Sequence, residues 1–203
     1  MKLAFTVTYI VENALYINVT NRCTNRCDFC IRKNDDGAYG SDSLWLVREP
    51  TVEEILDSVS QYDLAEFSEI VFCGYGEPSL RLDVCREVAL KIKEKHDIPV
   101  RINTNGHSDV FFGYDTAPLY KDAFDCVSIS LNTPSRVRYD EICHPMVDRA
   151  YDGMLAFAKE VKKYVPKVIF SVVRDFLTEA ELDDCRAIAE QCGVTLKIRD
   201  YIS

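Results

Sequence analysis

The sequence predicts an α/β protein folded as a partial, open barrel of the TIM type, (β/α)5-6, with about six parallel strands and a short N-terminal β-hairpin. Short β-branched runs alternate in strict order with amphipathic helical stretches, which is the pattern of a parallel sheet built from strand–helix units. A complete eight-stranded barrel typically needs about 250 residues, whereas this chain has 203. We therefore expect one domain, residues 1–203, in which the barrel stays open on one side.

The predicted strands are β-branched runs bounded by turn residues. The first two, at 5–9 and 14–19, form the hairpin around Glu12-Asn13, and the second of them starts the barrel. Five more runs follow, at 69–73, 100–103, 126–131, 167–173 and 194–199. Because the carboxyl ends of the parallel strands meet at one edge of the sheet, working residues are expected there.

Helix boundaries are predicted from their caps. Thr-x-x-Glu capping boxes at 51–54 and 178–181 start two helices, the first reaching about residue 62 and the second ending at the C-cap Gly193. The other predicted helices lie at 80–96 and 149–164, with a short one near 117–123. The polar, glycine-containing segment 34–43 is predicted to be a loop.

Composition and charge narrow the class of protein. The net charge of −9 disfavours general binding of nucleic-acid phosphates, although Arg22, Arg26, Arg32 and Lys33 form a local basic island or a set of solvated loop charges. The longest apolar run is far shorter than the roughly 20 residues of a membrane span. The N-terminus alternates like a strand and lacks the apolar region of a signal peptide. These features predict a cytoplasmic protein with no membrane contact and no general nucleic-acid binding.

Nine cysteines are many for a cytoplasmic chain, and their odd number argues against a disulfide framework. Cys23, Cys27 and Cys30 lie within eight residues, directly after the first barrel strand. Thiolates are the soft ligands of iron–sulfur clusters, and a loop with this spacing can wrap one metal centre. A structural zinc site would need a fourth Cys or His, and none follows nearby. Three thiolates on a [4Fe-4S] cluster leave one iron open to a chelating ligand.

The spacing Cys-x3-Cys-x2-Cys, with the aromatic Phe29 just before the last cysteine, resembles the signature of the radical S-adenosylmethionine (SAM) superfamily. The resemblance implies that Cys23, Cys27 and Cys30 hold one oxygen-sensitive [4Fe-4S] cluster, whose unique iron is chelated by the amino and carboxylate groups of SAM, with Phe29 among the cofactor-binding residues. In that family an electron from the reduced cluster cleaves SAM to methionine and a 5′-deoxyadenosyl radical, which abstracts hydrogen from a substrate. An electron donor such as flavodoxin or ferredoxin is implied as a partner.

The resemblance extends to the next two strand ends. Family members carry a Gly-Gly-Glu-Pro-like motif whose acidic residue holds the SAM amino group, and the segment 74–78 is similar, with Tyr75 in place of a glycine. Gly76 allows close backbone approach and Glu77 offers an ammonium acceptor, although an ordinary turn before a helix has the same composition. Asn103 begins Asn-Thr-Asn-Gly, which is similar to the Asp-Thr-Asn-Gly of glycyl-radical activating enzymes, with an uncharged amide in place of the carboxylate.

Polar residues alternate along the predicted strand 126–131. Ser128, Ser130 and Asn132 share one face, and Ile129 and Leu131 share the other. Polar groups at the barrel mouth suit the ribose hydroxyls or the carboxylate of SAM, unless they only meet solvent. We therefore include Ser130 and Asn132 among the expected cofactor-binding residues.

Charged residues near the last two strands are weaker candidates. Arg174, Lys197 and Arg199 are candidates for contacts with a carboxylate or the substrate, but charges at edge strands also block unwanted pairing. His144 follows Cys143 in a predicted loop with no third group to orient it. No residue is therefore assigned a catalytic role.

Segments 18–23, 30–32 and 44–51 resemble a subgroup, the TatD-associated radical SAM proteins, which implies a functional link to a TatD-type hydrolase without naming a substrate. Two other radical SAM classes are open: 7-carboxy-7-deazaguanine synthases, whose magnesium-binding Thr is Ile31 here, and glycyl-radical activating enzymes, whose cluster loop typically differs. The alternative of another class is a non-enzymatic iron–sulfur or zinc protein, acting as an electron carrier or scaffold. Because the predicted barrel is short, we expect substrate, a partner protein or a second subunit to cover its open side.

Overall fold

The structure is a computed structural model that describes residues 3–200. Its centre is a single seven-stranded sheet whose strands lie in the same order in space as in the chain. The strands are β1 (Thr8–Val11), β2 (Ala14–Ile17), β3 (Glu69–Phe72), β4 (Val100–Thr104), β5 (Cys126–Ser130), β6 (Lys167–Val173) and β7 (Thr195–Arg199). β1 pairs antiparallel with β2, and every later pair is parallel. The predicted hairpin, whose second strand is the first of six parallel strands, is therefore confirmed.

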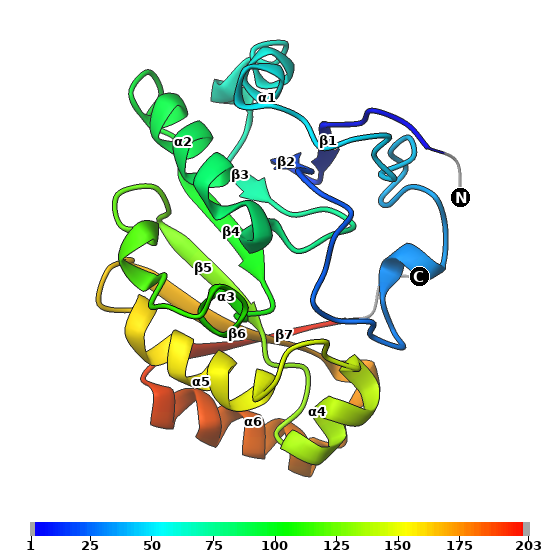
Figure 1. The fold of residues 1–203 in the computed structure, drawn as a ribbon, viewed down its shortest axis with the longest axis vertical. Coiled ribbons are helices and arrows are strands. Elements are labelled where there is room, and N and C mark those ends of the chain that lie inside the picture. Colours follow the sequence, from blue (N-terminus) through cyan, green and yellow to red (C-terminus); the bar gives the residue numbers. More distant parts are fainter. Residues whose placement is uncertain (1–2, 201–203) are drawn as a thin grey trace.

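The sheet is open, because β1 and β7 are its two edges and do not pair with each other. Helices connect the parallel strands: α1 (Val52–Val59), α2 (Leu82–Lys93), α3 (Ser108–Phe112), α4 (Arg136–Cys143), α5 (Ala150–Val161) and α6 (Glu179–Cys192). Short 3₁₀ helices are η1 (Ile31–Lys33), η2 (Leu64–Glu66), η3 (Pro78–Arg81), η4 (Ala117–Tyr120) and η5 (Arg174–Phe176). Figure 1 shows α2, α5 and α6 on one side of the sheet, and the long segment between β2 and α1 on the other.

The two faces of the sheet differ in chemistry. Side chains such as Phe72, Ile102 and Ile129 are fully buried and pack in one core with the apolar sides of α2, α5 and α6. The opposite face carries polar residues in register: Asn103 lies beside Ser128, and Ser130 lies beside Ser171. An open barrel therefore presents a polar inner face to whatever binds there.

Some predicted boundaries were wrong. The first hairpin strand is β1 at Thr8–Val11, not 5–9, because its pairing with β2 brings Thr8 opposite Ile17 while Phe5 stays 40% exposed. The strand predicted at 14–19 ends at Ile17, where the chain turns into the cysteine loop. The helix predicted at 80–96 starts within the 3₁₀ helix η3, and the α-helical part, α2, begins at Leu82 and ends at Lys93.

Two helices escaped the sequence prediction. α3 has only five residues, too few for a helical period to be read. α4 buries only Tyr139 and Cys143 of its eight residues, so its apolar stripe is too sparse to recognise. The segment predicted as a short helix near 117–123 is the four-residue 3₁₀ helix η4.

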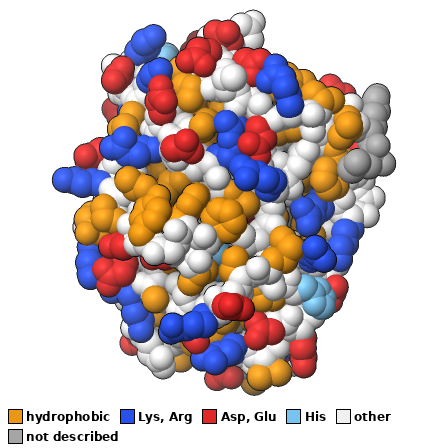
Figure 2. All heavy atoms as spheres, viewed as in Figure 1, with side chains coloured by type: hydrophobic (Ala, Val, Ile, Leu, Met, Phe, Trp, Pro, Cys, Tyr) orange, Lys and Arg blue, Asp and Glu red, His pale blue; other side chains and the backbone are white. Residues whose placement is uncertain are grey.

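Figure 2 shows charges of both signs on the face viewed, with apolar side chains gathered among them. Three exposed aromatic residues, Phe111, Phe112 and Tyr114, lie in or next to α3. The rings of Phe111 and Phe112 meet edge to face with centroids 5.0 Å apart, and the ring of Tyr114 lies tilted against Phe112 at 5.8 Å. Within residues 3–200, no helix has the length and apolar character that crossing a bilayer requires.

The N-cap of α6 gives a test of the fold. Thr178 Oγ1 accepts the backbone N–H of Glu181, and the Glu181 side chain accepts the N–H of Thr178, so both predicted capping-box bonds are present. Thr178→Ala removes the first of them and should lower the free energy of unfolding by about 1 kcal/mol in urea titrations. Thr178→Ser keeps the oxygen and should stay near the wild-type value. Equal losses in the two variants would contradict the assignment.

Candidate iron–sulfur and SAM site

The cysteine loop leaves the carboxyl end of β2 and crosses the mouth of the open barrel. Cys23, Cys27 and Cys30 are all free thiols, each partly buried. Cys27 is an electrostatic neighbour of both Cys23 and Cys30, which shows that the three sulfur atoms share one region. The structure thus brings together the predicted thiol ligands at the expected edge of the sheet.

The loop is held by the backbone of α4. The N–H of Arg26 donates to the carbonyl of Cys143, and the N–H of Asp28 donates to the carbonyl of Ile142, each over 2.9 Å. These two bonds lie on either side of Cys27. Its position is therefore set by the last turn of a helix more than a hundred residues further along the chain.

A buried hydrogen-bond network adds a second attachment. His107 Nδ1 and Thr24 Oγ1 are 3.0 Å apart, and His107 Nε2 and Tyr139 Oη are 2.9 Å apart. Asn25 Nδ2 donates to Tyr139 Oη over 3.1 Å, and Asn105 Nδ2 donates to Thr24 Oγ1 over 2.7 Å. The turn between Cys23 and Cys27 is therefore fixed to the end of β4 and to α4 by side chains that lie out of contact with water.

Glu77 lies buried between the ends of β3 and β4. Its Oε1 accepts the N–H of Ser79 over 3.0 Å, and its Oε2 accepts the N–H of Asn105 over 2.7 Å. Burial raises the pKa of this carboxyl, while hydrogen bonds, the first from Thr104, oppose the rise. Two backbone N–H groups and the side chains of Thr104 and Ser79 thus orient this carboxyl.

Glycines explain how Glu77 comes so near the cysteine loop. A Cβ on Gly76 would lie 2.3 Å from the carbonyl oxygen of Thr20 and 2.6 Å from that of Arg22, so only glycine fits. The next residue, Glu77, donates its N–H to Arg22 O over 2.7 Å. The predicted close backbone approach at Gly76 is thus an approach to the cysteine loop itself.

Tyr75, the departure from the family motif, has a structural role. The single hydrogen of its hydroxyl lies within reach of two carbonyl oxygens, that of Asp35 at 2.8 Å and that of Gly37 at 2.7 Å. Its ring packs on Trp45 with centroids 5.2 Å apart. Tyr75 therefore fastens the segment that follows the cysteine loop to the end of β3.

The other predicted cofactor residues are spread around this centre. Phe29 stacks on Phe176 of η5, with ring centroids 5.1 Å apart, and Ser130 is half-buried at the end of β5. Asn103 accepts a hydrogen bond from Arg101 Nη1 over 2.9 Å, deeper on the inner face. Asn132 has a left-handed backbone with φ of 63°. Its side-chain N–H points at the sulfur of Cys143, 3.4 Å away.

The charged residues predicted as weaker candidates lie in different environments. Arg174 is exposed and pairs with Glu179 over 3.1 Å, as a surface charge would. Lys197 lies beside Ser171 on the inner face, and Arg199 lies two residues further along the same face of β7. His144 caps α4, and its Nε2 is 3.1 Å from Asp28 Oδ1, so a third group does orient it.

The residues of the predicted basic island have different partners in the structure. Arg22 pairs with Glu49 over 2.8 Å at the surface, and Lys33 is 3.8 Å from Asp28. Arg32 instead donates to the carbonyl oxygens of Tyr75 and Asn25 over 3.5 and 3.4 Å. One guanidinium thus links the cysteine loop to the end of β3.

The donor set fits an iron–sulfur cluster. Burial first, and the nearby carboxylate of Glu77 second, raise the pKa of Cys23 to about 12, so a thiolate there requires a compensating positive charge. The backbone N–H of Asn25 points at Cys23 Sγ over 3.4 Å, an interaction that also stabilises a thiolate. Across residues 3–200, no three Cys, His, Asp or Glu side chains converge as the ligands of a single ion would. The thiolates of a cubane bind separate irons and lie further apart than ligands of one ion.

An open α/β barrel with three thiols at the carboxyl edge of its sheet, beside a buried carboxylate, defines a class of iron–sulfur proteins. The sequence profile of the Radical SAM superfamily matches residues 17–187, which is most of the chain. The protein belongs to the radical SAM superfamily, and it is an enzyme. The hypothesis of a non-enzymatic carrier or scaffold is therefore set aside.

Among curated proteins, the chain is 26% identical over 194 residues to a GTP 3′,8-cyclase of Acidothermus cellulolyticus, covering 93% of this chain and 51% of that protein. It is 30% identical over 145 residues to the GTP 3′,8-cyclase of Lactiplantibacillus plantarum, covering 70% and 41%. The chain thus spans about half or less of the length of these relatives.

The fold is similar to that of solved structures. SuiB of Streptococcus suis, bound to its precursor peptide SuiA, matches with a TM-score of 0.65 and 16% identity over 94% of this chain and 39% of that one. SuiB bound to S-adenosylmethionine matches with a TM-score of 0.60 over 93% of this chain and 38% of that one. These likenesses show the partial barrel fold.

Sequence reasoning missed His107, Tyr139 and Asn105 as residues that position the cysteine loop. Asn105 was within the quoted Asn-Thr-Asn-Gly segment, and His107 stands just beyond it, so proximity to that motif was a usable signal. Tyr139 carried no such signal, because its helix was not recognised.

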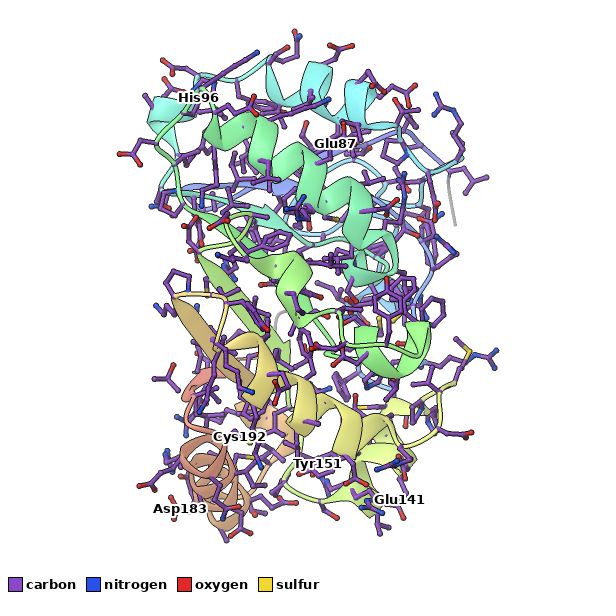
Figure 3. The ribbon with its side chains drawn as sticks, turned by 60° about the vertical axis from the view of Figure 1, so that its left-hand side comes forward. Glu87, His96, Glu141, Tyr151, Asp183 and Cys192 are labelled. Carbon is purple, nitrogen blue, oxygen red and sulfur yellow. The ribbon has the colours of Figure 1, made fainter. Side chains whose placement is uncertain are left out.

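His107 gives a pH-dependent test of the network. Burial lowers the pKa of His107 from 6.5 to about 4, so between these values the unfolded chain binds a proton that the folded chain does not. Stability should therefore fall as the pH falls through this window. The extra loss relative to the non-titrating His107→Gln should reach about 3 kcal/mol in urea titrations. His96→Gln, which removes the exposed histidine labelled in Figure 3, serves as the control.

The His96→Gln variant should follow the wild-type curve. A pH dependence that is the same in His107→Gln and in the wild type would contradict a buried, neutral His107.

Proposed function

We propose that this chain is a radical SAM core domain that cleaves SAM reductively, with Cys23, Cys27 and Cys30 holding one [4Fe-4S] cluster. The bound cluster and SAM supply the chemistry, a 5′-deoxyadenosyl radical that takes hydrogen from an unidentified substrate. The observation that supports this proposal is the position of the three thiols, on one loop at the carboxyl end of β2 beside the buried Glu77. An electron carrier has no need of that carboxylate.

Glu77 is proposed to bind the amino group of SAM. Its two oxygens are already oriented by the N–H groups of Ser79 and Asn105, so the carboxylate is held in one place before the cofactor arrives. The close approach of Gly76 to Arg22 brings this carboxylate to the cysteine loop. Glu77 and a cluster on that loop would therefore be close enough to bind the same amino-acid part of SAM together.

Phe29, Asn103, Ser130 and Asn132 are proposed to complete the SAM pocket, as the sequence resemblance implies. Ser130 has the most direct support, because it is half-buried at the carboxyl end of β5 on the polar inner face. Asn103 and Asn132 already have partners within the protein, Arg101 and Cys143 respectively. Their contacts with SAM would add to these bonds.

The wider assignments rest on the sequence resemblance. We propose a cytoplasmic enzyme of the TatD-associated subgroup, reduced by a flavodoxin or ferredoxin and functionally linked to a TatD-type hydrolase. Substrate, a partner or a second subunit is proposed to cover the open side of the barrel. GTP appears in the names of the matched cyclases, which are longer proteins, and we do not propose it as the substrate of this chain.

The first test is production of 5′-deoxyadenosine. Protein reconstituted with iron and sulfide without oxygen, reduced with dithionite and given SAM, should release 5′-deoxyadenosine and methionine, measured by chromatography and mass spectrometry. Cys23→Ser, Cys27→Ser and Cys30→Ser should each lose this product together with bound iron. Cys126→Ser, at a half-buried cysteine of β5, should keep both. A fully loaded wild-type protein that never forms the product would refute the proposal.

The second test concerns Glu77. Glu77→Gln keeps the shape of the side chain but removes the charge that attracts an ammonium group, so SAM should bind about tenfold more weakly. Equilibrium dialysis with labelled SAM measures the change, and circular dichroism confirms that the variant is folded. Glu87→Gln, on the outer surface of α2 (Figure 3), is the matched control and should bind SAM normally. Unchanged affinity in folded Glu77→Gln would rule out this role.

A further inference from the structure

Two cations lie next to each other on the inner face of the open barrel. Lys197 and Arg199 are alternate residues of β7, so their side chains leave the sheet on the same face. Lys197 pairs in register with Ser171 of the polar inner face, whereas Leu196 and Ile198 pack against the apolar core. The edge strand therefore presents two exposed positive charges to the interior of the barrel.

Neither cation has a counter-charge of its own. Arg101, another cation on the inner face, is neutralised by Glu69, with Nη2 and Oε1 2.7 Å apart. Across residues 3–200, Lys197 and Arg199 form no ion pair and no side-chain hydrogen bond. In a chain with a net charge of −9, two adjacent cations that no acidic side chain neutralises indicate a site for an anion.

Buried hydroxyl groups beside these cations also lack partners. Ser171 is 3% exposed, and Ser128 on the neighbouring strand is 6% exposed. A hydroxyl removed from water normally finds a partner, because an unsatisfied one costs about 1–3 kcal/mol. The part of the chain that the structure describes contains no side-chain hydrogen bond of either serine. Charges that only prevent strand pairing at an edge need no such hydroxyl beside them, so the group indicates a ligand.

The group lies at the reactive end of the barrel. β6 continues into η5, whose Phe176 stacks on Phe29 of the cysteine loop with ring centroids 5.1 Å apart. In the register of the sheet, Ser171 lies between Lys197 and Ser130, which is proposed to contact SAM. A ligand of Lys197 and Ser171 would therefore lie next to the SAM pocket.

Arg199 faces the same interior space from the edge strand. Burial raises the pKa of the Cys73 thiol just after β3, and a hydrogen bond from Asn103 opposes this rise together with the charges of Arg101 and Arg199. The guanidinium of Arg199 is therefore close to the inner end of β3, although the two strands are not neighbours in the sheet.

The charge of the group determines which anion fits it. Lys197 and Arg199 together carry two positive charges at neutral pH, whereas a single carboxylate carries one negative charge. A phosphate monoester carries about −1.5 to −2 at pH 7 and has three acceptor oxygens. These oxygens match the three kinds of donor present, which are an ammonium, a planar guanidinium and a serine hydroxyl.

We propose that Lys197, Arg199 and Ser171 bind a phosphate group of the substrate and so hold the substrate inside the barrel, next to the SAM pocket. The substrate is then a small phosphate ester. This inference deepens the proposed function and rests on it, because the site holds a substrate only if SAM is cleaved beside it.

The test uses radiolabelled inorganic phosphate and the full reconstituted chain, in equilibrium dialysis at constant ionic strength. The wild type should bind one phosphate per chain. Lys197→Gln and Arg199→Gln should each weaken binding about tenfold, because each removes one charge-assisted contact. Lys95→Gln is the control: it removes the same charge from an exposed position just beyond α2, next to the His96 labelled in Figure 3, and should bind phosphate normally.

Ser171→Ala separates a binding role from a structural one. Because this hydroxyl has no partner in the described chain, its removal should weaken phosphate binding about threefold. In urea titrations without phosphate, the same variant should keep the free energy of unfolding of the wild type. A Ser171→Ala chain that loses stability and binds phosphate normally overturns the role assigned to Ser171.

Competition separates the proposed site from the SAM site. SAM has a carboxylate of its own, and saturating SAM should leave phosphate bound. Displacement of phosphate by SAM overturns the inference, as does wild-type phosphate binding in both cation variants. Acetate should compete weakly, and competition as strong as that of unlabelled phosphate overturns the choice of a phosphate ester.

Failure of the inference can be distinguished from failure of the proposed function. A chain that forms 5′-deoxyadenosine but binds no phosphate overturns the inference alone. A chain that binds phosphate through Lys197 and Arg199 but never forms 5′-deoxyadenosine supports the anion site and refutes the proposed function.

Discussion

The structure depends on the attachment of one polar loop to parts of the chain that are distant in sequence. Two backbone bonds hold the loop to the last turn of α4, and His107 links Thr24 to Tyr139 through both ring nitrogens. The side chains of Thr24, His107 and Tyr139 are buried, and a buried polar group without a partner costs about 1–3 kcal/mol. The loop is therefore constrained to one conformation, and the three thiols keep their relative places without a disulfide among the described cysteines.

Glu77 shows how the barrel serves the same end. Parallel strands bring the turns after β3 and β4 to one edge, and the buried carboxylate joins them by accepting an N–H from each. Such a group would be costly inside the protein without those bonds. With them it forms a fixed negative point beside the thiols, at the boundary between the apolar core and the polar inner face. The structural and proposed binding roles of Glu77 thus follow from the same geometry.

The sheet could be predicted because short β-branched runs alternate along the chain with helices that begin at recognisable caps. The thiol loop and Glu77 could be located because their motifs are local. What could not be predicted arises from contacts between distant segments: Thr24 and His107 are 83 residues apart, and Asn25 and Tyr139 are 114 apart. α4 was missed because two buried residues do not make a readable stripe. Cys143 was interpreted as one of several scattered cysteines, since only the fold brings its backbone carbonyl to the N–H of Arg26.

The central claim is that three protein thiolates bind a cluster and leave one iron for SAM. Mössbauer spectroscopy of the anaerobically reconstituted protein, recorded with and without SAM, tests it most directly. The account predicts a cubane in which a single iron site changes its parameters when SAM is added, while the others keep theirs. A metal centre whose sites are all filled by the protein, and whose spectrum ignores SAM, would contradict it.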